Sequence, residues 1–279
     1  MKRLFLTGAL VLGFLLVSNI VFGDFYVIAT KPRLAGTEIK SLPYTITAPG
    51  FYYLTKNLTS TDDGIIVDVE DVTIDLMGFR IDGPGTSSDT NGIYLKKNYV
   101  EIRNGIIRNF ENGIAVFGSR QGIQVINIRA IYNDWGIKLD SSRGCRVKNC
   151  TAAHNNSTGI YLSDASTAAG NMVFFNGGSG IHVSSGATVI DNTAYGNQSD
   201  GIFAHYGATV TRNTAYQNTG DGFHIRRGST VTNNTAYDND GYGFNLETRN
   251  LFWNNTAYEN DSGNYNGCSI CTIGENYVP

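Results

Sequence analysis

Asparagine recurs along this chain at a fixed interval. Five asparagines are each 21 residues apart, namely Asn171, Asn192, Asn213, Asn234 and Asn255. Asn149, Asn127 and Asn104 extend the series toward the N-terminus at spacings of 22, 22 and 23 residues. A second column follows five or six residues behind the first: Asn109, Asn133, Asn155, Asn176, Asn197, Asn218, Asn239 and Asn260. Such repeats predict a solenoid in which each unit packs only against its neighbours.

Each unit has the pattern of three short strands. In the unit Gly201–Gln217, apolar and polar residues alternate in three segments, and each segment ends in turn-forming residues. Side chains alternate between the two faces of a strand, so Ile202 and Ala204 would point inward and Phe203 outward. A stack of helical pairs is the alternative, but it would need amphipathic runs of about ten residues or more.

The predicted fold is therefore all-β, a single-stranded parallel β-helix of about nine three-strand coils with an N-terminal cap. Right-handed winding is favoured because parallel crossovers strongly prefer that hand. Asparagine suits the corners, since it tolerates left-handed backbone and bonds nearby main chain. Stacked in successive coils, its amide can also bond the amides above and below it. We expect the five asparagines of the 21-residue series to lie in one line.

The N-terminal residues 1–23 have the pattern of a secretory signal peptide. Lys2 and Arg3 precede the apolar stretch Leu4–Val17, and small residues allow cleavage before Asp24. An uncleaved membrane anchor is the alternative. The prediction is a secreted or periplasmic protein with no membrane contact after cleavage of the signal.

Three further regions follow the signal peptide. Residues 24–63 do not fit the repeat and hold three of the five prolines, so we assign them to an N-terminal cap that covers the end of the core. The β-helix is assigned to residues 64–262. Residues 263–279, where the pattern decays, are assigned to a C-terminal cap or tail.

Charge and cysteine content exclude some functions. Without Lys2 and Arg3 the chain has 19 basic groups (21 less 2) against 24 acidic ones, which speaks against nucleic-acid binding. Cys268 and Cys271 are expected to form a local disulfide in an exported protein. A redox or metal function for this pair would need further ligands or a helix N-terminus. Cys145 and Cys150 flank a strand and are not expected to bond each other.

The repeat N-T-A-Y-x-N-x-x-x-G, found at Asn192, Asn213 and Asn234, resembles those of parallel β-helix proteins of the pectin-lyase-like superfamily. It is similar in particular to their carbohydrate-binding and sugar-hydrolysis type of repeat, which also occurs in the periplasmic β-helix protein of nitrous-oxide reductase maturation. The segments 42–54 and 72–79 resemble the cap and first coil of secreted bacterial members. The resemblance implies the fold and a polysaccharide partner, but the catalytic signatures of polygalacturonases and alginate epimerases do not occur here.

Successive coils would stack about 4.8 Å apart, so residues at the same position of each repeat would form columns on the surface. The outward position two residues after each repeat glycine gives one column: Tyr94, Ala115, Lys138, Tyr161, His182, Phe203, His224 and Asn245. Two residues further on lies a second column: Lys96, Phe117, Asp140, Ser163, Ser184, His205, Arg226 and Glu247. Three of the four histidines therefore share one face.

This face is the predicted polysaccharide-binding site. Lys138, Asp140, Phe203 and His205 are candidate binding residues. Uronate elimination or epimerisation needs a cation, a base and an acid. Arg226 is the candidate cation, His224 or His182 the base, and Tyr161 the acid or second base. The alternative is a solvated face with no ligand, where large polar residues satisfy strand propensity.

Metal binding is not predicted. Outward histidines spread over two coils do not make the tight donor cluster that zinc needs. No cofactor is predicted either; a calcium ion is left open as an alternative.

Two further features belong to the outer surface. Asp200 and Asp221 precede glycines in adjacent coils, a spacing near that of the carboxyl pair in retaining glycosidases. The alternative is that Asp-Gly is ordinary corner chemistry. A tyrosine column, Tyr195, Tyr216, Tyr237 and Tyr258, is continued by Phe174. It could stack on sugars or mediate assembly, or it could simply shield the strands as a packed ladder.

The sequence thus favours a secreted β-helix protein that recognises an extracellular or cell-envelope polysaccharide. Were it an enzyme, it would be a polysaccharide lyase, epimerase or hydrolase. The competing hypothesis is a non-catalytic structural, adhesive or maturation-accessory solenoid, which the regular 21-residue repetition supports.

Overall fold

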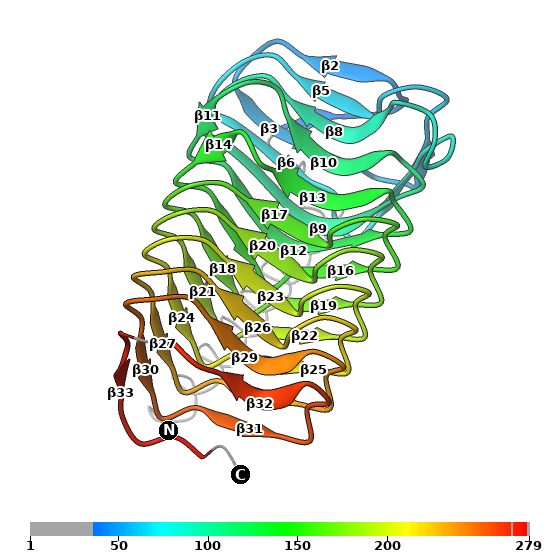
Figure 1. Cartoon of the computed structure of the whole chain (residues 1–279). Helices are drawn as coiled ribbons and strands as arrows, with labels where there is room; N and C mark the ends of the chain where they lie inside the picture. The colour runs from blue at the N-terminus through cyan, green and yellow to red at the C-terminus, as the bar shows by residue number, and fades with distance from the viewer. Residues whose placement is uncertain (1–35, 269, 278–279) are drawn as a thin grey trace, which may run out of the picture. The chain divides into compact units, whose positions relative to one another are not determined.

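The structure, a computed structural model, describes residues 36–268 and 270–277. The predicted signal peptide lies outside them. From Thr37 onward the chain forms one compact unit that consists of stacked coils (Figure 1). All strand pairs are parallel, and one sheet of the stack has 11 strands, so the number of coils is about 11 rather than nine. The described residues contain no helix that is long and apolar enough to cross a bilayer.

Every coil contributes one strand to this 11-stranded sheet. Its strands are β2 (Tyr44–Ile46), β5 (Ile65–Val67), β8 (Asn91–Leu95), β10 (Asn112–Val116), β13 (Trp135–Leu139), β17 (Ile160–Leu162), β20 (Ile181–Val183), β23 (Ile202–Ala204), β26 (Phe223–Ile225), β29 (Tyr242–Leu246) and β32 (Gly263–Asn266). The candidate site lies on the outer face of this sheet.

The other strands form a 20-stranded sheet that bends around the remaining sides of the coil. It contains β1 (Thr37–Glu38), β3 (Gly50–Tyr53), β4 (Leu58–Thr59), β6 (Val72–Asp75), β7 (Arg80–Asp82), β9 (Val100–Arg108), β12 (Gln124–Ile131), β15 (Arg146–Lys148), β16 (Thr151–Ala153), β18 (Thr167–Ala169), β19 (Met172–Phe174), β21 (Thr188–Ile190), β22 (Thr193–Tyr195), β24 (Thr209–Thr211), β25 (Thr214–Tyr216), β27 (Thr230–Thr232), β28 (Thr235–Tyr237), β30 (Leu251–Trp253), β31 (Thr256–Tyr258) and β33 (Thr272–Ile273). A separate pair joins β11 (Arg120–Gln121) to β14 (Ser142–Arg143).

Alternation along each strand fills the core with small and branched apolar side chains. In β23, Ile202 and Ala204 are buried and Phe203 between them is partly exposed, as the pattern predicted. Near the C-terminal end larger residues replace the aliphatic ones, and the rings of Phe223 and Phe244 stack in the core with centroids 4.8 Å apart. The outward positions are therefore free to carry polar and aromatic groups.

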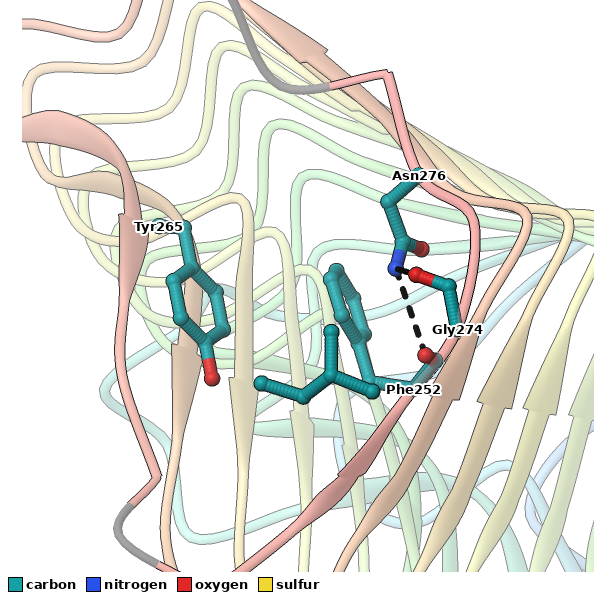
Figure 2. A pocket seen from close by; sticks show the side chains of 5 residues that line it. Phe252, Tyr265, Gly274 and Asn276 are labelled. Carbon is teal, nitrogen blue, oxygen red and sulfur yellow. Dashed lines mark hydrogen bonds between the residues drawn. The ribbon is translucent and has the colours of Figure 1, made fainter.

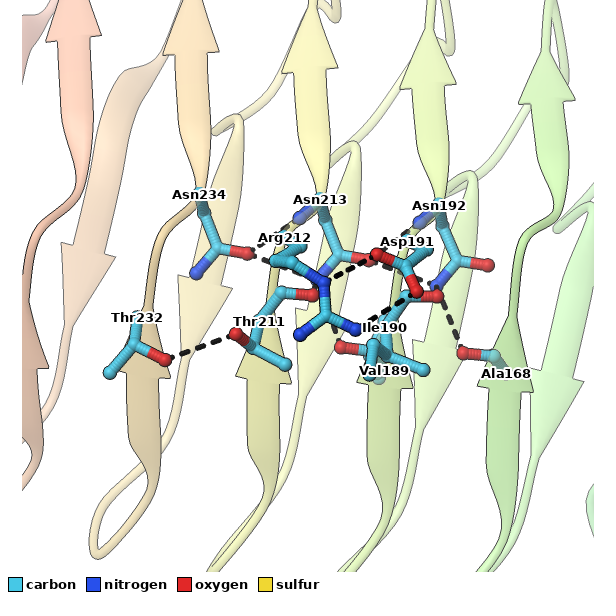
Figure 3. Close-up of polar contacts among 10 residues, drawn as sticks. All are labelled: Ala168, Val189, Ile190, Asp191, Asn192, Thr211, Arg212, Asn213, Thr232 and Asn234. Carbon is cyan, nitrogen blue, oxygen red and sulfur yellow. Dashed lines mark hydrogen bonds and ion pairs between the residues drawn. The ribbon is translucent and has the colours of Figure 1, made fainter.

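The predicted asparagine ladder is confirmed (Figure 3). The side-chain oxygen of Asn213 accepts hydrogen bonds from the backbone N–H and the side-chain amide of Asn192, both at 2.9 Å. Its own amide donates to the carbonyls of Val189 and Thr211 and to the side-chain oxygen of Asn234. The bonds between neighbouring rungs recur from Asn171 to Asn255, so the buried amides satisfy one another and the corner backbone together.

The extension of this ladder to Asn149, Asn127 and Asn104 was wrong by one position. All three have positive φ, and they share the corner place of Arg212, immediately before the ladder rung. Cys150 occupies the rung itself, and its backbone N–H donates to the side-chain oxygen of Asn171. Asparagine is suited to either place, so spacing alone does not distinguish the two.

The second asparagine column forms a ladder of its own from residue 133 to residue 260. Asn197, for example, donates its amide to the side-chain oxygen of Asn218 at 2.9 Å. The repeat glycines pack against this ladder. A Cβ atom on Gly201 would lie 2.7 Å from the amide nitrogen of Asn218 and 2.8 Å from the carbonyl oxygen of Gly222. The glycine column exists because the ladder leaves no room for a side chain.

The coil stack extends beyond the limits predicted from the sequence. Strands β2, β3 and β4, within the predicted cap, pair in parallel with β5, β6 and β7. At the other end, β32 and β33 pair with β29 and β30. The N-terminal coils keep the strand pairing but lack the asparagine–glycine template, which is why the pattern did not reveal them. At the C-terminal end Asn276 continues the 21-residue series and accepts hydrogen bonds from Asn255, a signal that the sequence analysis missed.

The C-terminal residues cover part of the last coil. Figure 2 shows Asn276 donating hydrogen bonds to the carbonyls of Phe252 and Gly274, so it adds a rung to the asparagine ladder. Tyr265 stacks over Phe252 with ring centroids 5.4 Å apart. Cys268 and Cys271 form the predicted disulfide, and Cys145 and Cys150 are free and buried.

The tyrosine column is a packed ladder. Successive rings from Phe174 to Tyr258 lie 4.8–5.2 Å apart with interplanar angles of 3–9°. Their faces are covered by one another, which leaves ring edges and hydroxyl groups at the surface. This geometry favours shielding of the strands over sugar stacking.

Candidate functional site

The outward column on the 11-stranded sheet is confirmed residue by residue. The parallel register aligns Lys138 with Tyr161, then His182, Phe203 and His224 in successive strands from β13 to β26. We call Tyr161, His182, Phe203 and His224 the ring column. Their ring centroids lie 4.3–4.7 Å from one neighbour to the next.

Phe203 is the centre of this arrangement. The rings of His182 and His224 lie on either side of it along the axis, each 4.7 Å away. His205 lies 5.0 Å away, and the guanidinium of Arg226 lies 5.4 Å from the Phe203 ring. The sequence-predicted residues of the histidine face are therefore gathered around one aromatic ring.

Arg226 is held by groups on both sides. It donates a hydrogen bond from Nη1 to the hydroxyl of Tyr206 at 3.2 Å. Its Nε is buried, has no hydrogen-bond partner, and lies 3.8 Å from a carboxylate oxygen of Glu247, beyond hydrogen-bond distance. The Nε donor is thus unsatisfied, while the side chain as a whole is 34% exposed.

The histidines of this face have different electrostatic environments. Burial, with His205 and Arg226 nearby, lowers the pKa of His182 to about 4. Burial and Arg226 also lower the pKa of His205. A side-chain interaction with Asp200, reinforced by Asp221, raises the pKa of His224. At neutral pH His182 is therefore neutral, and its buried Nε2 has no hydrogen-bond partner.

The His182 environment predicts a loss of stability in acid. Its pKa in the folded protein, about 4, lies below the value of about 6.5 expected in the unfolded chain. Between these values the unfolded chain binds a proton that the folded protein does not, so stability falls as the pH falls from 6.5 to 4. After allowance for partial exposure we expect a loss of about 2 kcal/mol, which His182→Gln should remove. Urea unfolding at pH 7 and pH 4.5 tests this, and equal losses in both proteins would contradict it.

Asp200, Asp221 and His224 form a compact group that we call the Asp–His cluster. Nδ1 of His224 lies 3.5 Å from Oδ2 of Asp200 and 3.6 Å from Oδ2 of Asp221. One donor atom from each residue lies within 4.8 Å of the others. The carboxylates do stack in adjacent coils, as predicted, but an imidazole lies against both of them, which is not the open pair that a retaining glycosidase needs.

Lys138 and Asp140 lie apart from the histidines, in a polar cleft of about 320 Å³. Its lining also includes Asp89, Asn91, Tyr94 and Asn112, and we call it the loop cleft. The ammonium of Lys138 lies 4.6 Å from the ring of Trp135. The side-chain oxygen of Asn112 is buried there and has no hydrogen-bond partner.

Sequence reasoning missed the loop cleft. One wall comes from the segment between β7 and β8, which includes Asp89 and carries none of the repeat's asparagine or glycine columns. Thr86 in this segment accepts a hydrogen bond from the side chain of Asn156, 70 residues later. The insertion that breaks the repeat was the available signal, because an insertion in a regular solenoid often marks the binding face.

Solved structures with similar folds are β-helix proteins that act on polysaccharides or occur in phage tails. One is the A-module of mannuronan C-5 epimerase AlgE4 from Azotobacter vinelandii (TM-score 0.57, 14% identity, 77% of this chain and 70% of that chain). Another is pectate lyase Pel9A (TM-score 0.60, 15% identity, 82% of this chain and 72% of that chain). A third is the enzymatically active domain of tailspike protein 2 of bacteriophage CBA120 (TM-score 0.63, 13% identity, 85% of this chain and 47% of that chain). At these identities the likeness shows the fold alone.

The fold therefore defines a parallel β-helix protein, with an architecture similar to that of pectate lyase Pel9A. More particularly, the chain belongs to the NosD family: residues 56–277 match the family described as "Periplasmic copper-binding protein (NosD)". No curated protein sequence matches the chain significantly.

The family description raises the question of copper donors. Copper(I) prefers sulfur ligands. Cys145 and Cys150 are buried, and burial raises the pKa of the Cys150 thiol to about 12. Cys268 and Cys271 are joined in a disulfide. No cysteine among the described residues is thus available as a thiolate ligand.

Copper(II) accepts imidazole nitrogen and carboxylate oxygen, and the Asp–His cluster supplies that set. The residues present therefore fit copper(II) in donor type and do not fit copper(I). An ion bound there would supply positive charge beside the ring column.

Proposed function

We propose that the chain binds an acidic polysaccharide along the outer face of the 11-stranded sheet, in the periplasm or outside the cell. The observation that carries this proposal is the grouping of His182, His205, His224 and Arg226 around the ring of Phe203. The epimerase and pectate lyase with similar folds support a polysaccharide as the partner class.

A uronate residue suits this grouping chemically. An aromatic ring offers an apolar face to the C–H groups of a sugar, and a guanidinium binds a carboxylate through charge-assisted hydrogen bonds. Phe203 and Arg226 supply these two groups side by side, and the guanidinium of Arg226, whose side chain is 34% exposed, is the donor for the carboxylate. A neutral glycan would leave that donor unused.

The loop cleft extends the proposed binding surface along the axis. Lys138 lies four coils from His224 in the same column, which is about 19 Å at the usual strand spacing. Its ammonium offers a second cation for a polyanion, beside the buried oxygen of Asn112. A chain of several sugar units would contact both regions, whereas a monosaccharide would contact one.

Catalysis on a bound uronate would require a base and an acid. His182 is the better candidate for the base, because it stays neutral above about pH 4. The ring of Tyr161 packs against it, with centroids 4.3 Å apart, as the candidate acid. Burial and Asp140 raise the pKa of Tyr161, so it keeps its proton at neutral pH. Turnover should then decline only near pH 4, and His182→Gln should abolish it.

Binding is tested by calorimetry of the mature protein with polyuronates and neutral glycans. Arg226→Ala should weaken polyuronate binding about 10- to 100-fold, since loss of a hydrogen bond to a charged group costs about 1.5–3 kcal/mol. Arg212→Ala is the matched control, because Arg212 pairs with Asp191 at another corner of the coil. No polyuronate binding by the folded wild type would contradict the proposal. An ultraviolet product assay on the same samples separates a lyase from a binding protein.

A non-catalytic accessory role is the second candidate. Membership of the NosD family favours it, because that family is described by metal binding and not by an enzymatic activity. Polyuronate binding without any product would support this role.

A further inference from the structure

We infer that Asp200, Asp221 and His224 form a binding site for one divalent transition-metal ion, with Cu²⁺ bound more tightly than Zn²⁺. This inference does not depend on polysaccharide binding. Among the described residues, this is the one group of three or more histidine, cysteine and carboxylate side chains whose donor atoms converge. It mixes nitrogen and oxygen donors and lies on rigid strands and corners of the solenoid.

The repeat places the three donors together. Asp200 and Asp221 precede Gly201 and Gly222, which come directly before the equivalent strands β23 and β26 in adjacent coils. His224 is the outward residue of β26, three residues after Asp221. Adjacent coils therefore bring one carboxylate to either side of the imidazole nitrogen, although the aspartates are 21 residues apart in sequence.

The separations fit shared coordination better than direct hydrogen bonding. The N–O separations of 3.5 and 3.6 Å are too long for good hydrogen bonds between His224 and either carboxylate. Two ligand atoms about 2.1 Å from one ion, at a tetrahedral angle, lie about 3.4 Å apart. The imidazole nitrogen is thus already at a ligand-to-ligand distance from each carboxylate, and the three donor atoms lie within 4.8 Å of one another.

Other hydrogen bonds hold both carboxylates in place. Oδ1 of Asp200 accepts the backbone N–H of Asp221, and Oδ1 of Asp221 accepts that of Tyr242. Oδ2 of Asp221 also accepts a hydrogen bond from the amide of Asn245 at 2.8 Å. Such outer contacts orient ligands and tune metal affinity. The side chains are 12–31% exposed, so an ion can enter from solvent.

The donor set selects the class of ion. One imidazole and two carboxylates suit divalent ions of the first transition row. Along that row, from Mn²⁺ onward, the affinity of such a site increases up to Cu²⁺ and is lower for Zn²⁺. Calcium needs six to eight oxygen ligands, which two carboxylates do not provide. Copper(I) would need sulfur ligands, which this cluster lacks.

The test is titration of the tag-free, chelator-treated full mature protein with CuSO₄, ZnCl₂ and CaCl₂ by calorimetry, with electron paramagnetic resonance of the copper sample. We expect one Cu²⁺ per chain, tighter than Zn²⁺, weak or undetectable Ca²⁺ binding, and hyperfine coupling to one nitrogen. His224→Ala should abolish the saturable copper site. Asn245→Ala, which removes one outer contact, should weaken it about 10-fold.

Two variants control for non-specific copper binding. Asp191→Asn changes an exposed carboxylate paired with Arg212, and His154→Gln changes an exposed histidine between Tyr132 and Phe175. Both should keep the wild-type copper site. Copper binding that survives His224→Ala, or only weak multisite binding by the wild type, would overturn the inference and leave the cluster as an ion triad around a protonated imidazole. Because no glycan is present, the outcome is separate from that of the polysaccharide test.

Discussion

Asn213→Ala is expected to lower the free energy of unfolding by about 3 kcal/mol, the cost of leaving more than one buried polar group without its partner. The substitution removes the acceptor for the backbone N–H of Asn192 and the donor to the carbonyl of Val189. It also removes the hydrogen bond from the side-chain amide of residue 213 to the side-chain oxygen of Asn234, which keeps only the bond from the backbone N–H. Urea unfolding followed by circular dichroism measures the loss.

The control for this prediction is Thr209→Ala. Thr209 is an exposed residue of β24, and its replacement should change stability by no more than about 0.5 kcal/mol. If the two variants unfolded at the same urea concentration, the ladder would have no special structural role.

Gly201→Ala is expected to destabilise the protein by about 3 kcal/mol, at the upper end of the range for overpacking. The added methyl group would overlap the amide of Asn218 and the carbonyl of Gly222. Neither can move freely, because Asn218 is held in the second ladder by its neighbours. Thermal and urea unfolding of the variant test the expectation.

Gly186→Ala separates this steric effect from the loss of glycine's backbone freedom. Gly186 has φ of +66° and nothing within 4 Å of an added Cβ, so its replacement should cost only about 1 kcal/mol. Equal losses in the two variants would mean that close packing against the ladder is not the reason for the glycine column.

Much of the fold followed from the period of the sequence. A parallel stack repeats the same environment in each coil, so a residue type required at one rung is required at the next. This logic predicted the rungs from Asn171 to Asn255 and the alignment of His182, Phe203 and His224, all of which the register confirms. It failed where the template is absent, as in strands β2 to β4.

Only the tertiary structure decided the details of the site. Asp200 and Asp221 were considered as a carboxyl pair and His224 as a base, but their convergence depends on side-chain directions at a corner, which a sequence period does not specify. The loop cleft is lined by residues of successive coils, from Asp89 to Asp140, which only the folded chain brings together. Cys150 replaced asparagine at a rung because its backbone N–H still meets the oxygen of Asn171. Sequence determined the strands and their register because these repeat, whereas contacts made once in the molecule required the folded chain.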